Sequence, residues 1–197
     1  MKNTLTIIAA LLLALNGTFA TVRTVSNDPQ GGSQYPGLRE AYLAASNGDT
    51  LLVEGTNLNY SIWDGCNCCN FTPWNKGLVV IGAGLNTQKT NPAFRATYLQ
   101  ATFSCNGNNE WVLASGANNS KFYGISFTTN SSFYFSTGVN SITFENCYFP
   151  ISVNFNNQSA TNINFRNCIF GQDNGQNITL SPTGTANTVQ IFNCIFD

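Results

Sequence analysis

The hexapeptide F-E-N-C-Y-F at residues 144–149 recurs along this chain. It returns as F-R-N-C-I-F at residues 165–170 and as I-F-N-C-I-F at residues 191–196, and F-Y-G-I-S-F at residues 122–127 is a degenerate copy. The copies start roughly 20 to 26 residues apart, a period typical of solenoid proteins whose repeats stack on one another. The repeat therefore predicts a stack of similar chain turns.

One repeat is predicted to contain a bend between two short strands. Ile142 and Phe144 alternate with polar neighbours, as in a half-buried strand. Asn146 interrupts this alternation, and Asn tolerates the left-handed backbone conformation better than most residues. A second strand then starts, with Cys147 and Phe149 directed inward. The motif is thus interpreted as strand, Asn corner and strand.

A third short run around Val153, Asn154 and Phe155 completes one coil, and no crossover helix fits between coils. Three strands per coil predict an all-β fold, a right-handed parallel β-helix. Equivalent residues of successive coils would then lie about 4.8 Å apart and form ladders. The expected ladders contain Asn146, Asn167 and Asn193, and the buried free thiols of Cys147, Cys168 and Cys194.

An N-terminal capping α-helix is predicted at about residues 37–46. Leu38, Ala41, Tyr42 and Ala45 recur at helical spacing before Asn-Gly-Asp at residues 47–49. Such a helix would cover the open strand edges at one end of the stack. Strands are expected next to it at residues 50–53 and 78–81.

Residues 1–20 have the pattern of a secretory signal peptide. Lys2 precedes an apolar stretch at residues 5–15, and Thr-Phe-Ala at residues 18–20 suits a peptidase that cuts before Thr21. Residues 21–197 would then form one β-helix domain that is secreted or displayed at the cell surface. No later stretch is apolar enough to span a membrane after signal cleavage.

The composition points to contact with neutral polar partners. Charged residues make up 9% of the chain, the net charge is −1, and no basic face is evident, which argues against nucleic acid as a partner. The polar surface comes from Asn, Ser, Thr and Gly, which suits contact with a polysaccharide or a cell-surface glycan.

Two further stretches resemble a known family. Residues 35–55 (Y-P-G-L-R-E-A-Y-L-A-A-S-N-G-D-T-L-L-V-E-G) and 75–84 (N-K-G-L-V-V-I-G-A-G) are similar to the opening of secreted bacterial right-handed parallel β-helix proteins of the pectate-lyase-like superfamily. This resemblance implies the fold, whereas the family includes lyases, hydrolases and adhesins. Its lyases use clustered carboxylates for calcium and its glycosidases use paired Asp residues.

The acidic residues do not match those family sites. No two are adjacent or equivalent in successive coils, and the chain has no His, so we expect no catalytic residues, metal site or cofactor here. Glu145 and Arg166 occupy equivalent outward positions and are expected to form a cross-strand ion pair.

Four side chains are candidates for ligand binding. Trp63 and Trp74 would either stack on a sugar ring or form a small core under their loop. Tyr148 is expected to form an outward ladder with Ile169 and Ile195, with Phe192 on the neighbouring strand. This ladder is either a glycan platform, a docking face or a consequence of strand propensity. Arg166 is the fourth candidate, as a ligand for an acidic sugar.

Cys66, Cys68, Cys69 and Cys105 are disulfide candidates, because export favours disulfides. A vicinal bond would be strained, which leaves Cys105 bonded to Cys68 or Cys69. A zinc site is the disfavoured alternative, since the spacing is unusual and His is lacking.

The sequence thus favours a noncatalytic secreted or cell-surface scaffold, adhesin-like or glycan-binding. The alternative is the N-terminal part of a polysaccharide lyase or glycoside hydrolase whose active site lies beyond residue 197. The chain ends in mid-coil without a polar cap, which suggests that it is an N-terminal fragment followed by further coils or domains.

Overall fold

The structure of the protein is a computed structural model, and its described part is mostly β. It describes residues 20–56, 59–60, 62, 73–84, 97–100, 102–103, 109–128, 132–149, 152–154, 160–171 and 188–196. These residues form three sheets, one α-helix and one short 3-10 helix, η1, at Ser115–Ala117. None of the helices among them is long and apolar enough to cross a membrane.

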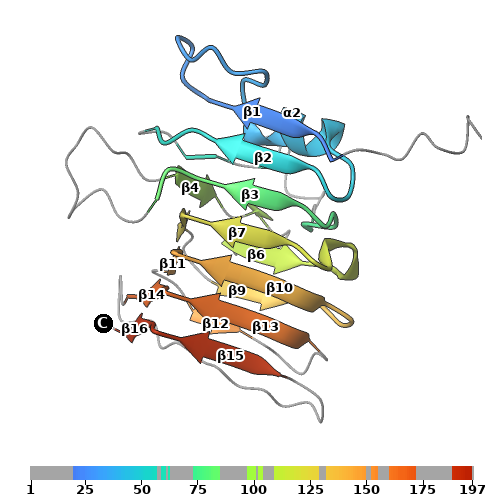
Figure 1. Cartoon of the computed structure of the whole chain (residues 1–197), viewed down its shortest axis with the longest axis vertical. Coiled ribbons are helices and arrows are strands. Elements are labelled where there is room, and N and C mark those ends of the chain that lie inside the picture. The colour runs from blue at the N-terminus through green and yellow to red at the C-terminus, as the bar shows by residue number, and fades with distance from the viewer. Residues whose placement is uncertain are drawn as a thin grey trace, which may run out of the picture.

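The largest sheet has seven strands, and every neighbouring pair in it is parallel (Figure 1). Its strands follow one another in chain order, and each comes from a different pass of the chain. In that order they are β1 (Val22–Val25), β2 (Thr50–Val53), β3 (Val79–Ile81), β7 (Lys121–Tyr123), β10 (Asn140–Glu145), β13 (Thr161–Arg166) and β15 (Val189–Phe192).

Two smaller sheets repeat this chain-order arrangement. The five-stranded sheet is parallel and contains β4 (Thr97–Gln100), β8 (Ile125–Thr128), β11 (Tyr148–Phe149), β14 (Ile169–Phe170) and β16 (Ile195–Phe196). The four-stranded sheet contains β5 (Thr102–Phe103), β6 (Asn109–Leu113), β9 (Ser132–Phe135) and β12 (Ser152–Asn154). Its β5–β6 pair is antiparallel, and the others are parallel.

The register predicted from the repeated hexapeptide is confirmed. Phe144 pairs with Phe122 on one side and Phe165 on the other, and Phe165 pairs with Ile191. Phe122, Phe144 and Phe165 are fully buried, whereas Glu145 is half-buried and Arg166 exposed. Parallel strands in one register, one pass after another, fit a β-helix-like fold.

The predicted Asn corners are also confirmed. Asn146, Asn167 and Asn193 have φ values of 53°, 50° and 49°, and Asn193 Nδ2 donates to Asn167 Oδ1 at 2.7 Å. Gly124 takes the same place in the degenerate repeat, with φ 62°. A Cβ there would lie 2.9 Å from the backbone of Gly84, so both the conformation and the close approach require glycine.

Stacked phenylalanines form much of the interior. The rings of Phe127, Phe149 and Phe170 stack in sequence, with centroids 5.0 and 5.3 Å apart. A second column contains Phe122 and Phe144, 5.2 Å apart. Both columns cross several passes. The stabilisation that comes from burying these apolar rings therefore depends on correct stacking of neighbouring passes.

The cysteines of the repeat are free thiols, as predicted. Cys147 and Cys168 are buried, and Cys194 is half-buried. The Cys147 Sγ lies 3.4 Å from the carbonyl oxygen of Phe122 in the preceding pass. Burial raises the pKa of the Cys147 thiol well above its usual range, which suits a packing role.

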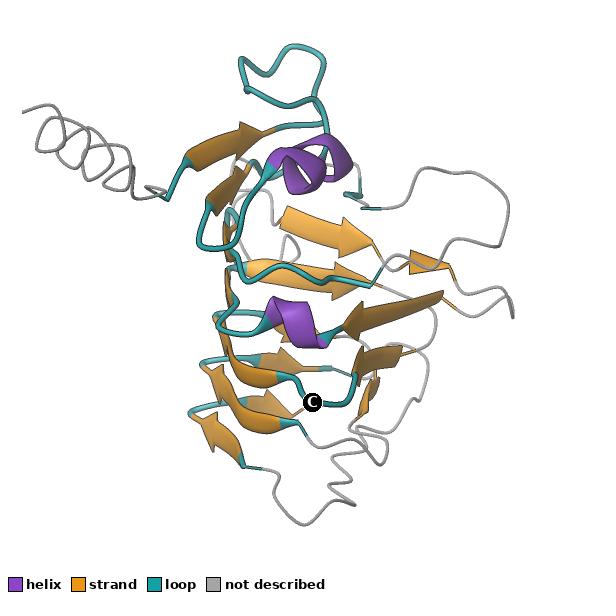
Figure 2. Cartoon of the chain, turned by 90° about the vertical axis from the view of Figure 1, so that its right-hand side faces the viewer, coloured by secondary structure: helices purple, strands orange, loops and turns teal. Residues whose placement is uncertain are grey.

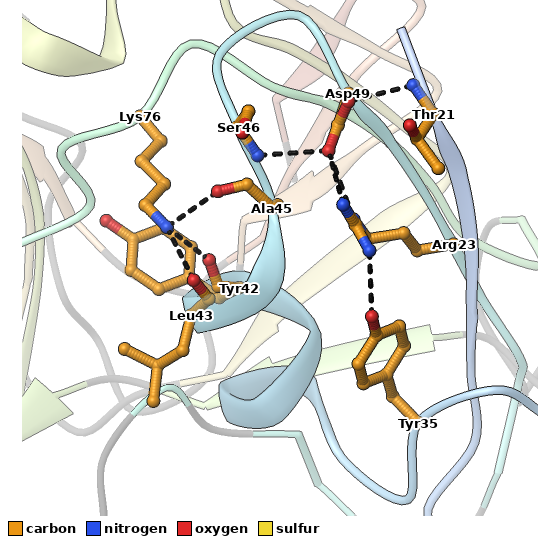
Figure 3. Close-up of polar contacts among 9 residues, drawn as sticks. All are labelled: Thr21, Arg23, Tyr35, Tyr42, Leu43, Ala45, Ser46, Asp49 and Lys76. Carbon is orange, nitrogen blue, oxygen red and sulfur yellow. Dashed lines mark hydrogen bonds and ion pairs between the residues drawn. The ribbon is translucent and has the colours of Figure 1, made fainter.

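Helix α2 (Leu38–Ala44) lies within the predicted range, at the β1 and β2 end of the molecule (Figure 2). Leu38, Ala41 and Tyr42 are buried against the core. Lys76 Nζ donates to the carbonyl oxygens of Tyr42, Leu43 and Ala45 at 2.7, 3.1 and 2.8 Å (Figure 3). A cation thus satisfies carbonyls that a helix leaves unpaired at its C-terminus.

Several predictions concern residues outside the described part of the chain. They are residues 1–19 of the predicted leader (residues 1–20), Trp63, Phe155, and the disulfide candidates Cys66, Cys68, Cys69 and Cys105.

Candidate functional site

One line of outward side chains crosses the seven-stranded sheet from edge to edge. It takes one residue from each strand, and each is paired in register with the next. At about 4.8 Å per strand the line is roughly 29 Å long. We call it the outer row, and it consists of Thr24, Leu52, Ile81, Tyr123, Glu145, Arg166 and Phe192.

The outer row exposes apolar side chains near both ends and carries polar groups between them. Leu52 and Ile81 are each 37% exposed, and Phe192 is 52% exposed. Between them lie a half-buried phenol ring, Tyr123, and the half-buried carboxylate of Glu145. Leu52 and Ile81 are register partners, so their exposed side chains lie next to each other beside the polar groups of the row.

The predicted ion pair between Glu145 and Arg166 is wrong. The two residues are register partners, but among the described residues they form no ion pair. The Arg166 guanidinium instead lies over the ring of Phe192, 5.9 Å from its centroid. A guanidinium gains as much from an aromatic face as from an exposed carboxylate, so the next strand competes successfully for it.

An open groove adjoins the outer row where the row crosses β1, β2 and β3. Its volume is about 460 Å³, and Leu52 and Ile81 of the outer row line it. Thr24, Gly32, Ser33 and Glu54 add polar groups to its wall. Glu54 is exposed, so the groove offers a second carboxylate at the end of the row distant from Arg166.

Trp74 is a correction to the predicted binding residues. Its side chain is fully buried, and its ring contacts those of Tyr42 and Phe122, with centroids 4.8 and 5.5 Å apart. Stacking on a sugar is therefore excluded for this ring. The structure places it in the core, the other interpretation of its sequence context.

Tyr148 lies on the five-stranded sheet, away from Arg166 on the seven-stranded sheet. Its predicted ladder with Ile169 and Ile195 has the expected register. The Tyr148 ring is half-buried, and its hydroxyl lies close to the backbone of Gly171. A Cβ atom at position 171 would be 2.8 Å from that hydroxyl. The structure thus does not gather Trp74, Tyr148 and Arg166 into one site.

Sequence reasoning missed Tyr123, Leu52 and Ile81 as site residues. Tyr123 follows Phe122 in the degenerate repeat, as Glu145 follows Phe144, so the repeat itself could have identified it. Leu52 and Ile81 precede the repeats, and their place in the row depends on the pairing of β2 and β3.

Comparisons with known proteins leave the family open. No family model matches the chain, and no curated protein matches its sequence. A solved structure titled "Rhamnogalacturonan lyase" is similar over 90% of this chain and 58% of its own, with 11% sequence identity and a TM-score of 0.49. The chain therefore spans less than two thirds of the length of that protein.

Proposed function

We propose that this protein is a secreted or cell-surface right-handed parallel β-helix that binds an extended polysaccharide along the outer row. It binds this ligand without cleaving it. The observation that carries the proposal is the unbroken register of the outer row, from the groove at β1–β3 to Phe192.

The β-helix part of the proposal is supported by strand order and corners. In all three sheets the strands follow one another in chain order, and apart from the antiparallel β5–β6 pair each strand of a sheet comes from a different pass. Positive φ values recur at Asn146, Asn167 and Asn193, between the strands of the seven-stranded and five-stranded sheets. A regular turn of this kind lets each pass return to the same place in the stack.

The chemistry of the outer row suits a sugar chain. Tyr123 and Phe192 offer ring surface to the apolar faces of sugars, and Tyr123 also has a hydroxyl. Glu145 accepts hydrogen bonds from sugar hydroxyls, and Arg166 donates to hydroxyls or to an acidic sugar. A rigid sheet holds these groups at fixed spacing, which lowers the entropy cost of binding an extended ligand.

The test is a glycan array followed by calorimetry of each hit with the wild-type protein and three variants. Tyr123→Ala, Glu145→Gln and Arg166→Gln are each expected to weaken binding about tenfold or more, which corresponds to about 1.4 kcal/mol. Asp28→Asn removes an exposed carboxylate that belongs to neither the outer row nor the groove lining, and it should bind as wild type. Binding that all three variants retain would exclude the outer row.

Catalysis is tested on the same ligands. Chain cleavage by the purified protein, detected as new reducing ends, would replace the binding role by a polysaccharide lyase or glycoside hydrolase. If cleavage persists in Glu145→Gln and Arg166→Gln, its active site lies elsewhere in the chain.

A further inference from the structure

The buried side chain of Asp49 lies at the centre of a polar cluster near the start of the fold. It is 3% exposed. Its Oδ2 accepts from Ser46 N at 3.0 Å and from Arg23 Nε at 3.0 Å, and it also forms an ion pair with Arg23 Nη2 at 3.0 Å. The remaining oxygen, Oδ1, accepts from the backbone nitrogen of Thr21 at 2.8 Å (Figure 3).

The backbone of Thr21 is held from both sides. Its nitrogen contacts Asp49, and its carbonyl oxygen accepts from Thr50 N at 2.9 Å. Ala20 and Thr21 are both exposed, so the peptide bond between them is at the surface. The sequence independently predicts that a signal peptidase cuts this bond.

We propose that Asp49 is the binding site for the α-ammonium group that forms when the Ala20–Thr21 bond is hydrolysed. A signal peptidase and one water molecule break the C–N bond. The water oxygen goes to the Ala20 carbonyl carbon, which leaves as a carboxylate, and the Thr21 nitrogen takes up protons to become an ammonium group. The nitrogen that donates to Asp49 thereby gains a positive charge without having to move.

Processing then converts a neutral hydrogen bond into a charge-assisted one. Such bonds are roughly twice as strong as bonds between neutral groups. The Asp49 carboxylate would face two cations, Arg23 on β1 and the ammonium group, and Lys76 adds a more distant positive charge. The Tyr35 hydroxyl also contacts this cluster, because it accepts from Arg23 Nη1 at 2.7 Å. The Asp49 Oδ1 atom lies 2.8 Å from the Thr21 nitrogen, which is close enough for direct pairing with the ammonium group.

The sign of the pH dependence follows from this pairing. An α-amino group in an unfolded chain has a pKa of about 7.7 to 8.0, and contact with Asp49 raises it in the folded protein. The added stability is therefore present at pH 6 to 7 and is lost as the pH rises through the higher, folded value.

The experiment starts from the full chain exported by a bacterial host. Intact mass and N-terminal sequencing of the exported protein should show Thr21 as the first residue, and any other first residue would overturn the proposal. The α-amino group of the processed protein is then acetylated, which keeps the N–H donor but removes the charge. Urea unfolding of both forms is followed from pH 6 to 10.

The free-amine form should have the higher urea midpoint at pH 6 to 7, and the difference should vanish toward pH 10. Asp49→Asn should abolish the difference, and Asp28→Asn should keep it. Equal midpoints, or a difference that does not depend on pH, would refute the role of Asp49. If Asp49→Asn does not fold, the rate of acetylation decides instead: the Thr21 amine should react more slowly in the folded wild-type protein than in urea.

Discussion

The ring of Phe144 stacks on the ring of Phe165 in the next pass, with centroids 5.1 Å apart and planes 10° apart. Both rings are fully buried, and their residues are direct register partners in the seven-stranded sheet. The same residue thus takes part in strand pairing and in core packing. Strand pairing and core packing therefore depend on each other at this position.

Phe144→Ala should destabilise the protein by about 3 to 5 kcal/mol, because it leaves a cavity between stacked rings. Urea unfolding followed by tryptophan fluorescence measures the change. Phe192→Ala is the control, since Phe192 is 52% exposed, and it should cost no more than about 1 kcal/mol. Similar losses in both variants would contradict the central role of the phenylalanine column.

Asn167→Ala should destabilise by about 1 to 2 kcal/mol, because a side chain with a Cβ but no local hydrogen bonding disfavours φ of 50°. Asn167→Gly tolerates that φ and should lose less, chiefly the bond from Asn193. Gln190→Ala, at an exposed strand position, provides the baseline. The idea fails if Gly is no better than Ala at position 167.

Asp49 should make stability depend on pH in acid. Burial alone would raise the pKa of Asp49, but bonds from Ser46, Thr21 and Arg23 outweigh it, so the pKa is lower than the ordinary 3.8. This contribution is present above the unfolded pKa and is lost as the pH falls through the folded one. Asp49→Asn should have a lower urea midpoint than wild type at pH 7. As the pH falls below about 4, the midpoint of the variant should decrease less than that of wild type. Asp28→Asn should keep the wild-type slope.

Lys76→Met should destabilise by about 1 to 3 kcal/mol, because three helix carbonyls lose a charged donor. Thermal unfolding measures the loss. Lys121→Met removes an exposed lysine from the sheet and should have little effect. Equal stability of wild type and Lys76→Met would show that water replaces the ammonium group at the helix end.

Cys147 should resist alkylation in the folded protein. Its thiol is buried, and burial raises its pKa, so both access and the thiolate fraction are low. Peptide mapping after iodoacetamide treatment at pH 8 should show Cys194, which is half-buried, labelled before Cys147. Labelling of Cys147 at the rate of the urea-unfolded protein would contradict the structure.

The repeat alone predicted the strands, the inward residues and the corners. Alternation needs only two sheet faces, and a left-handed corner needs Asn or Gly, so both leave direct marks in the sequence. The Glu145–Arg166 ion pair was predicted from the same register and was wrong. Phe192 was recognised on a neighbouring strand, but its contact with the Arg166 guanidinium depends on side-chain conformation.

Trp74 shows a second limit of prediction from the sequence. It lies outside the repeats, so no equivalent position indicated its direction, and only the contacts with Tyr42 and Phe122 place it in the core.

The sequence by itself determined the period of the stack, the inward and outward faces of each repeat and the packing role of its cysteines, because these follow from local alternation and backbone preference. Only the tertiary structure decided which residues share the outer row before the repeats begin, since connections of different length set the pairing of β2, β3 and β7. It also decided the contact between Thr21 and Asp49, 28 residues apart. Contacts across such separations depend on how the whole chain packs, and no local pattern encodes them.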